Sequence, residues 1–182
     1  MFSSILNPKS EDYSPVTWNA ESGHLEDPLL NNLRVMIIDA DFYKALRDNL
    51  YTRFQSGASL ILYEMGRGYG EVIAKTIKQN DPGRLEIYRK FMDRGKRQGY
   101  GEFRVPLLQS IISGLRGEAK VVLKDSFFAS ASGQTGHKEC WIIAGMIAGA
   151  GSKILKRDVV CVEELCISKE DPHCEFRLKS SA

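Results

Sequence analysis

The amino-acid sequence predicts an α+β domain in which helices pack on one face of an antiparallel sheet. Two patterns carry this prediction. Residues 41–97 place apolar side chains at helical spacing, whereas residues 101–130 and 159–178 contain runs with strand character. Apolar residues make up 43% of the 182 residues, so the chain can bury one core without help from disulfides.

Residues 1–28 are expected to form a flexible tail, because they are rich in Ser, Asn, Asp and Glu and show no sustained periodicity. The folded domain is expected to span residues 29–182. Residues 33–38 form a short apolar run that fits a buried strand, and Asp39 or Asp41 can then cap a helix. That helix runs to about Gln55, and one of its faces carries four apolar side chains, Phe42, Leu46, Leu50 and Phe54.

A second helix is expected from about Ser59 to Lys78. It contains Gly66, Gly68 and Gly70, and each glycine inside a helix costs up to about 1 kcal/mol relative to alanine. This cost suggests that another element or a ligand packs closely against the helix.

A third helix is expected after a turn at residues 80–83, where Leu85, Tyr88 and Phe91 or Met92 recur at helical spacing. The side of this helix that faces away from the core is expected to be basic and solvated. Its basic residues are Arg84, Arg89, Lys90, Arg94 and Arg97.

Strand character returns in the second half of the chain. Residues 101–105 and 119–130 form two such runs, and the second includes Phe127 and Phe128. Residues 159–166 and 174–178 are expected to form two more strands around a polar loop.

Residues 140–151 form the most apolar segment and carry no charge. The segment is too short to span a membrane and too apolar for a surface helix, so we expect it to be the central buried helix. Gly145 and Gly149 lie four residues apart on it and leave a smooth stripe that a neighbour can approach closely.

The composition argues against several classes of protein. A net charge of +2 leaves no dominant basic face for nucleic acid, and no apolar run reaches the roughly 18 residues of a membrane span. The N-terminus lacks the pattern of a signal peptide, so a cytoplasmic protein is expected. In a reducing compartment, clustered cysteines indicate a metal site or catalysis rather than disulfides.

Three of the four cysteines fall within residues 161–174. Cys166 and Cys174 stand at opposite ends of a seven-residue loop, so a hairpin can bring both sulfurs together. Cys140 sits at the start of the buried helix, where the helix dipole favours a thiolate. These positions indicate a metal site, although the spacing is not that of a zinc finger.

The carboxylate of the site can come from Glu163 or Glu164. In a regular strand Glu164 shares a face with Cys166, whereas Glu163 points the other way. The alternative to a metal site is that Cys140 and Cys161 are simply small buried hydrophobes.

The C-terminal part of the chain resembles the 4-vinyl reductase domain family, which includes the input domains of bacterial transcription activators that sense phenols and xylenes. The resemblance covers about residues 30–180 and is most specific in the last 45, and it implies a fold class shared with TRAPP subunits. The residues that carry it are Cys140-Trp141, Gly145, Gly149, Glu163-x-x-Cys166 and Asp171-x-x-Cys174, with weaker support from Lys124-Asp125-Ser126-Phe127 and Met65-Gly66-x-Gly68-Tyr69.

In the sensor members of this family, three Cys and one Glu hold a zinc ion. The choice of Glu163 requires the strand to turn or bulge before Cys166. Four protein ligands close the shell of a zinc ion, so the resemblance implies a structural Zn²⁺ rather than a catalytic one. His173 is a substitute ligand, and Cys161 is expected in the core. The pattern of the family carries over onto Cys140, Glu163, Cys166 and Cys174.

The resemblance also implies a small hydrophobic or aromatic ligand enclosed in the interior. We expect Tyr69, Phe127 and Trp141 to border its cavity, because aromatic residues usually line such sites. The chain departs from the sensors at Leu123, where they carry Trp, and no histidine near Gln109 can bond a phenol hydroxyl. Phenol itself is therefore not the expected ligand.

The leading hypothesis is a zinc-stabilised ligand-binding or sensor domain that acts through a homodimer or a partner protein. The surplus of apolar helical surface in residues 41–78 motivates the homodimer. One alternative is an enzyme or accessory protein in tetrapyrrole vinyl reduction, ranked lower because the sequence supplies no hydride-donor site. The glycines of residues 66–70 follow a helical pattern, not a strand, and a zinc-bound Cys140 cannot act as a nucleophile with His137. The other alternative is a TRAPP-like dimeric scaffold without a ligand.

Overall fold

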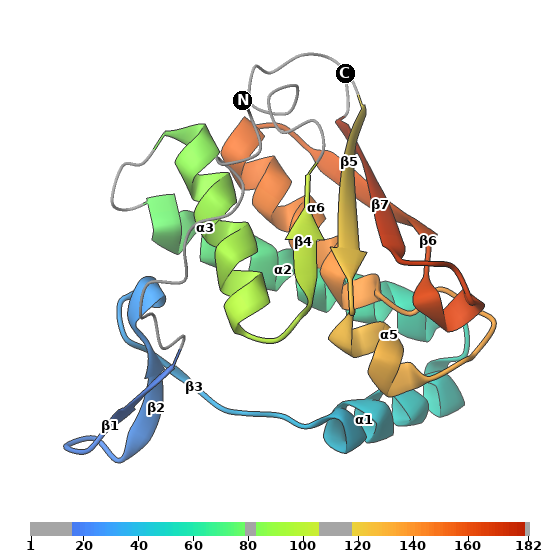
Figure 1. The fold of residues 1–182 in the computed structure, drawn as a ribbon, viewed down its shortest axis with the longest axis horizontal. Coiled ribbons are helices and arrows are strands. Elements are labelled where there is room, and N and C mark those ends of the chain that lie inside the picture. The colour runs from blue at the N-terminus through green and yellow to red at the C-terminus, as the bar shows by residue number, and fades with distance from the viewer. Residues whose placement is uncertain (1–15, 79–82, 106–117, 181–182) are drawn as a thin grey trace. The chain divides into compact units, whose positions relative to one another are not determined.

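The computed structural model describes residues 16–78, 83–105 and 118–180 (Figure 1). It divides into two compact units, residues 1–36 and residues 37–182, which are described separately below. Most of the expected tail, the tip of the turn before the third helix and Gln109 lie outside the described residues.

The first unit contains a small antiparallel sheet of three strands in the order β1-β2-β3, namely β1 (Thr17–Asn19), β2 (His24–Asp27) and β3 (Leu33–Val35). The Asn19 side chain accepts hydrogen bonds from the backbone N–H groups of Glu21 and Ser22, which closes the turn between the first two strands. The sequence did not predict β1 and β2, and the division of the chain into a tail and one domain stays a prediction.

The prediction of a buried strand over residues 33–38 is wrong. Only Leu33–Val35 is a strand, and Leu33, Met36 and Ile37 are all exposed. The physical reason is that β3 pairs only with the short strand β2, so the small sheet has little apolar surface with which to cover the run.

The second unit begins with three helices, α1 (Ala40–Phe54), α2 (Gly57–Lys78) and α3 (Arg84–Arg97). Asp39 caps α1, as predicted, because its side chain accepts a hydrogen bond of 2.7 Å from the backbone N–H of Phe42. The buried residue of α1 is Tyr43, whereas Phe42 and Phe54 are exposed. The predicted apolar face of α1 therefore points away from the core.

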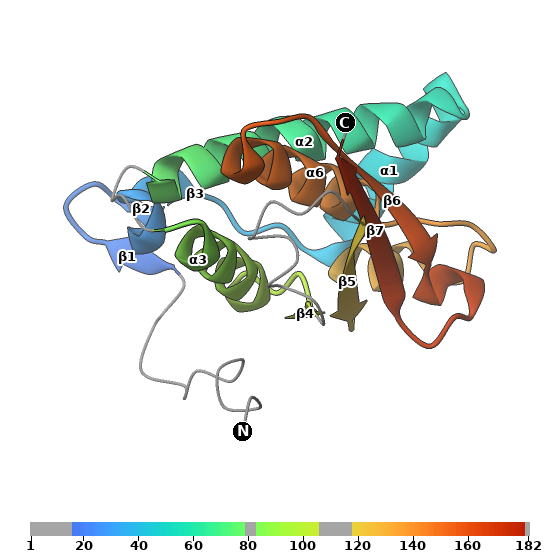
Figure 2. The same cartoon turned by 90° about the horizontal axis from the view of Figure 1, so that it is seen from above.

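Helices α2 and α6 (Trp141–Leu155) lie side by side and interlock through four glycines (Figures 1 and 2). A Cβ atom on Gly66 or Gly70 would lie 2.1 Å from a backbone carbonyl oxygen of α6, and one on Gly145 or Gly149 would lie 2.0 Å from a carbonyl oxygen of α2. Only glycine permits this approach. The predicted close packing and the central buried helix are confirmed, while Gly68 faces open space.

The second unit also contains an antiparallel four-stranded sheet in the order β4-β5-β7-β6. Its inner face is apolar and buried, with Val121, Leu123 and Phe176 among its side chains, while Val160 and Val162 are exposed on the outer face. Helix α6 packs on the inner face, so the predicted α+β class is confirmed. The strands are β4 (Glu102–Arg104), β5 (Glu118–Lys124), β6 (Val159–Leu165) and β7 (Cys174–Ser180).

Two local predictions are wrong. The predicted strand over residues 119–130 ends at Lys124, because Asp125 takes a positive φ of 52° and Ser126 then caps the short helix α5 (Phe127–Ser132). Arg94 is not on a solvated face of α3 but is 2% exposed, and its guanidinium donates a hydrogen bond of 2.8 Å to the Tyr69 hydroxyl.

Candidate metal centre

Four side chains from separate elements meet in the core of the second unit. Cys140 is the residue before α6, Glu163 belongs to β6, Cys166 follows that strand, and Cys174 is the first residue of β7. All four are completely buried, and their ligand atoms lie within 4.8 Å of one another. The structure therefore brings together the four residues that the sequence predicted as ligands.

A bulge in β6 explains why Glu163, and not Glu164, reaches the cluster. Glu163 pairs with Phe176 and Leu165 pairs with Glu175, so the extra residue Glu164 has no partner in the ladder. The carboxylate of Glu164 instead binds the Arg177 guanidinium at 2.7 Å, outside the cluster. The bulge that the choice of Glu163 requires is present.

The distances between the sulfur atoms fit a tetrahedral metal site. Cys140 Sγ lies 3.5 Å from Cys174 Sγ, which lies 4.0 Å from Cys166 Sγ. A tetrahedron with zinc–sulfur bonds of about 2.3 Å has sulfur–sulfur edges of about 3.8 Å. All the cysteines are free, and the separations far exceed the roughly 2.05 Å of a disulfide.

The carboxylate of Glu163 is only half satisfied. Its Oε2 accepts a hydrogen bond of 3.0 Å from the backbone N–H of Cys140, while its Oε1 is buried without a partner. A buried oxygen without a hydrogen bond costs about 1–3 kcal/mol, and a bound cation would remove this cost. The donor set and the orphaned oxygen therefore both fit a metal ion.

The electrostatics of the cluster also favour a cation. Burial raises the pKa of the Glu163 carboxyl to about 8 and raises the pKa of the Cys140 thiol well above its usual value. Hydrogen bonds from Cys140 and Cys174 lower the pKa of Cys166, which makes it the first thiolate to form. Among the described residues, no Lys or Arg side chain bonds to these groups, so a divalent ion is the charge that would let all four ionise.

Neighbouring groups hold the ligands in place. Ser126 Oγ lies 3.1 Å from Cys140 Sγ, and the Asp171 carboxylate accepts a hydrogen bond of 2.8 Å from the backbone N–H of Cys166. The backbone N–H groups of Thr135 and Gly136 donate to the carbonyl of Ser168, which ties the loop before α6 to the β6–β7 connection. Sequence reasoning did not assign these supporting roles, because they join segments far apart in the chain.

The two substitute candidates lie outside the cluster. His173 is partly exposed and its Nε2 lies 3.7 Å from the Glu175 carboxylate. Cys161 is buried in β6, and its backbone N–H donates to the Tyr63 hydroxyl. Neither residue shares the ligand cluster.

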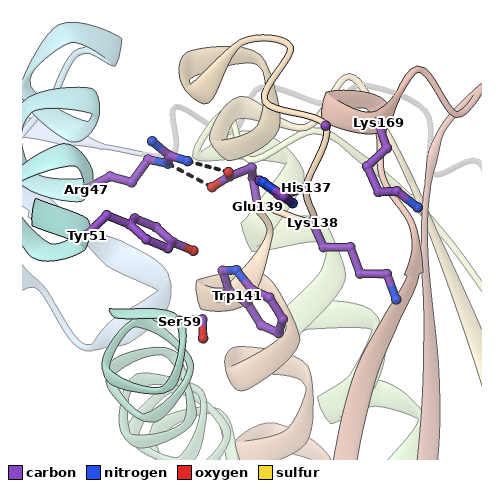
Figure 3. A pocket seen from close by; sticks show the side chains of 9 residues that line it. Arg47, Tyr51, Ser59, His137, Lys138, Glu139, Trp141 and Lys169 are labelled. Atoms are coloured by element: carbon purple, nitrogen blue, oxygen red, sulfur yellow. Dashed lines mark hydrogen bonds and ion pairs between the residues drawn. The ribbon is translucent and has the colours of Figure 1, made fainter. Parts of the chain in front are cut away.

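The three predicted ligand-contacting residues do not meet at one cavity. The Tyr69 hydroxyl accepts a hydrogen bond from Arg94, and the Phe127 ring packs edge-on against Phe128 with the centroids 5.4 Å apart. Trp141 lines an open surface pocket beside α1 (Figure 3).

A separate apolar crevice lies between α2, α3, α6 and β4. Arg94 and Tyr100 are its polar members, and its side chains leave no room for a water-sized molecule. The other side chains that line it are Ile73, Phe91, Phe103, Ile143, Met146 and Ile147.

Comparisons with known proteins agree with this architecture. Residues 120–180 match the model of the vinyl-4-reductase domain. An uncharacterised protein of Methanocaldococcus jannaschii, MJ0150, is 28% identical over 159 residues, which cover 87% of this chain and 83% of that protein.

Three solved structures share the fold. The phenol-responsive sensory domain of the transcription activator PoxR, solved with phenol, aligns with a TM-score of 0.73 at 18% identity, covering 91% of this chain and 85% of that one. A vinyl-4-reductase family protein from Methanocaldococcus jannaschii gives 0.60 at 18%, covering 81% and 85%. Subunit 3 of the trafficking protein particle complex from Naegleria fowleri, covalently bound to palmitic acid, gives 0.51 at 16%, covering 79% and 93%.

No helix in the described part of the chain combines the length and apolar character needed to cross a bilayer. The segment that matches the domain model contains Glu163, Cys166 and Cys174, and the fold around it is shared with the sensory domain and the vinyl-4-reductase protein. Residues 120–180 are thus a vinyl-4-reductase domain, and the predicted resemblance of this chain to the 4-vinyl reductase domain family is confirmed.

Proposed function

We propose that this chain is a zinc-stabilised domain that binds a small hydrophobic molecule and acts through a homodimer or a partner protein. The observation that carries the proposal is the buried cluster of three thiols and one half-satisfied carboxylate. Thiolate-rich, four-ligand sites select zinc among the common divalent metals. Because four protein ligands complete a tetrahedron, the metal would be structural.

The crevice between α2, α3, α6 and β4 is the favoured place for the ligand. It is apolar except for Arg94 and Tyr100, which suits a small apolar molecule with one hydrogen-bonding group. The crevice is closed in this structure, so binding would have to separate α3 and β4 from α6. The phenol-bound sensory domain with the same fold supports a ligand in this class of domain.

The homodimer is supported by the exposed apolar side chains of the first two helices. Leu60, Met65 and Val72 of α2 are each more than half exposed, as are Phe42 and Phe54 of α1. Large apolar side chains gathered on neighbouring helices favour an interface. This observation also supports the second candidate function, a dimeric scaffold without a ligand.

Native mass spectrometry of the purified full chain tests the proposal, because metal, ligand and oligomeric state appear in one spectrum. We expect one zinc ion per chain, a dimer, and a stabilising shift with small apolar alcohols. Ile147→Phe should fill the crevice and abolish that shift, whereas the control Val162→Phe, on the exposed face of β6, should not. Zinc and a dimer without any such ligand would favour the scaffold, and a metal-free monomer would refute both functions.

A further inference from the structure

A second pocket, with a volume of about 640 Å³, opens between α1, the start of α2 and the loop that leads into α6 (Figure 3). Arg47 and Tyr51 line it from α1, Ser59 from α2 and Trp141 from the first position of α6. None of its lining residues belongs to the apolar crevice, so the two spaces are separate sites.

The charges that line this pocket are positive in excess. The only carboxylate among them, Glu139, is 1% exposed and accepts two hydrogen bonds from the Arg47 guanidinium, one of them 2.8 Å long. This pair neutralises itself. Within the described residues, Lys138 and Lys169 also line the pocket and neither forms an ion pair. Two ammonium groups are therefore left to bind an anion.

The rest of the pocket is aromatic. The Tyr51 side chain points toward Trp141, and both lysine side chains extend along the Trp141 side of the pocket (Figure 3). The Arg47 guanidinium lies 4.6 Å above the centre of the Tyr51 ring, which holds this ring in place. The indole Nε1–H of Trp141 is buried and makes no hydrogen bond, so an acceptor on a ligand would satisfy it.

The walls of the pocket are held from both sides. Glu139 is bound by Arg47 of α1, the next residue, Cys140, is anchored in the metal cluster, and Trp141 begins α6. Three consecutive residues are thus fixed to three different parts of the unit. A site held in this way loses little conformational entropy when a ligand binds.

We propose that this pocket binds a small organic anion with a planar aromatic body. The anionic group would lie between Lys138 and Lys169, and the flat body would pack against Trp141 and Tyr51. The inference does not rest on the ligand of the crevice, which is expected to be mostly apolar. It assigns the chain a second, surface-accessible site of opposite preference.

Titration of the full-length, metal-loaded protein with 2-naphthoate tests the proposal. The chain has two tryptophans, so in a Trp18→Phe background the fluorescence of Trp141 alone reports binding. We expect saturable quenching by 2-naphthoate, and much weaker binding of the neutral 2-naphthylmethanol and of inorganic phosphate. These two arms separate recognition of the charge from recognition of the ring.

The double variant Lys138→Gln/Lys169→Gln should lower the affinity for 2-naphthoate about tenfold, since it removes two partly solvated charge contacts. The matched control Lys75→Gln/Lys96→Gln removes the same charge from exposed positions on α2 and α3 and should leave the affinity unchanged. Ile147→Phe, which fills the crevice, should also leave it unchanged, so failure of the proposed function and failure of this site are distinguishable.

Three results would overturn the inference. They are the absence of saturable binding up to millimolar 2-naphthoate, equal affinity for the neutral alcohol, and equal losses in the two double variants. Phosphate that binds as tightly as 2-naphthoate would show an anion site without aromatic recognition and would overturn it as well.

Discussion

Cys174→Ser is the most direct perturbation of the metal centre. The Cys174 sulfur lies between those of Cys140 and Cys166, and its backbone pairs with Leu123 in β5. A bound metal would therefore connect the start of α6 to the β6–β7 hairpin and to the middle of the sheet. Replacing this thiol leaves three ligands and one weak hydroxyl, so stoichiometric zinc should be lost.

The expected magnitude follows from mass action. A metal present at a thousand times its dissociation constant stabilises the folded state by about 4 kcal/mol. In a domain of this size about 1 kcal/mol corresponds to about 2–4 °C, so the melting temperature should fall by about 8–16 °C. The loss should concentrate in α6 and the hairpin, where hydrogen exchange should speed up most.

The assay combines zinc analysis with thermal unfolding, and Cys161→Ser is its matched control. Cys161 is buried like the ligands but lies outside the cluster, so this variant should keep one zinc per chain. Wild-type protein, purified without chelators, that carries well below one metal ion per chain would refute the metal site. A Cys161→Ser variant that loses zinc as completely as Cys174→Ser would refute the ligand assignment.

Three further predictions rest on the same geometry. Glu163→Gln should weaken zinc binding by tenfold or more, on the order of one lost charged ligand, whereas Glu164→Gln should leave it unchanged because Glu164 binds Arg177; metal competition titrations measure both, and a larger effect at Glu164 would reverse the choice. Metal-free protein should lose stability as pH rises from about 5 to 8, because the folded-state pKa of Glu163 is raised to about 8 and burial opposes its ionisation; Glu163→Gln should flatten this slope in denaturant titrations, and an unchanged slope would contradict the assignment. Gly145→Ala should destabilise the fold by about 1–3 kcal/mol or more, because its Cβ would lie 2.0 Å from the Tyr63 carbonyl oxygen, whereas Gly68→Ala, in open space, should stabilise it by up to about 1 kcal/mol; similar melting temperatures for the two variants would refute the helix interlock.

Local patterns predicted the parts of the fold that depend on short-range chemistry. The absence of charge in residues 140–151 marked the central helix, and Gly66, Gly70, Gly145 and Gly149 marked its tightest contact. The predictions that failed depend on which surface covers an apolar run. Residues 33–38 read as a buried strand, yet the small sheet around them has no layer of its own to bury them.

The candidate ligands illustrate the same division. Clustering and family resemblance led to Cys140, Cys166 and Cys174, and both depend only on the order of residues along the chain. Strand parity alone would have selected Glu164. The bulge between Glu163 and Leu165 decided otherwise, because it turns Glu163 into the core and leaves Glu164 to Arg177.

The sequence by itself determined the α+β class, the glycine stripes and the identity of the clustered thiols, because each follows from residue type and spacing. Only the tertiary structure decided the pocket beside α1. Its ion pair joins Arg47 to Glu139, which lie 92 residues apart, and no local pattern links them. The separation of Tyr69, Phe127 and Trp141 was decided in the same way, since the packing of whole helices determines where an inward-facing aromatic ring finally lies.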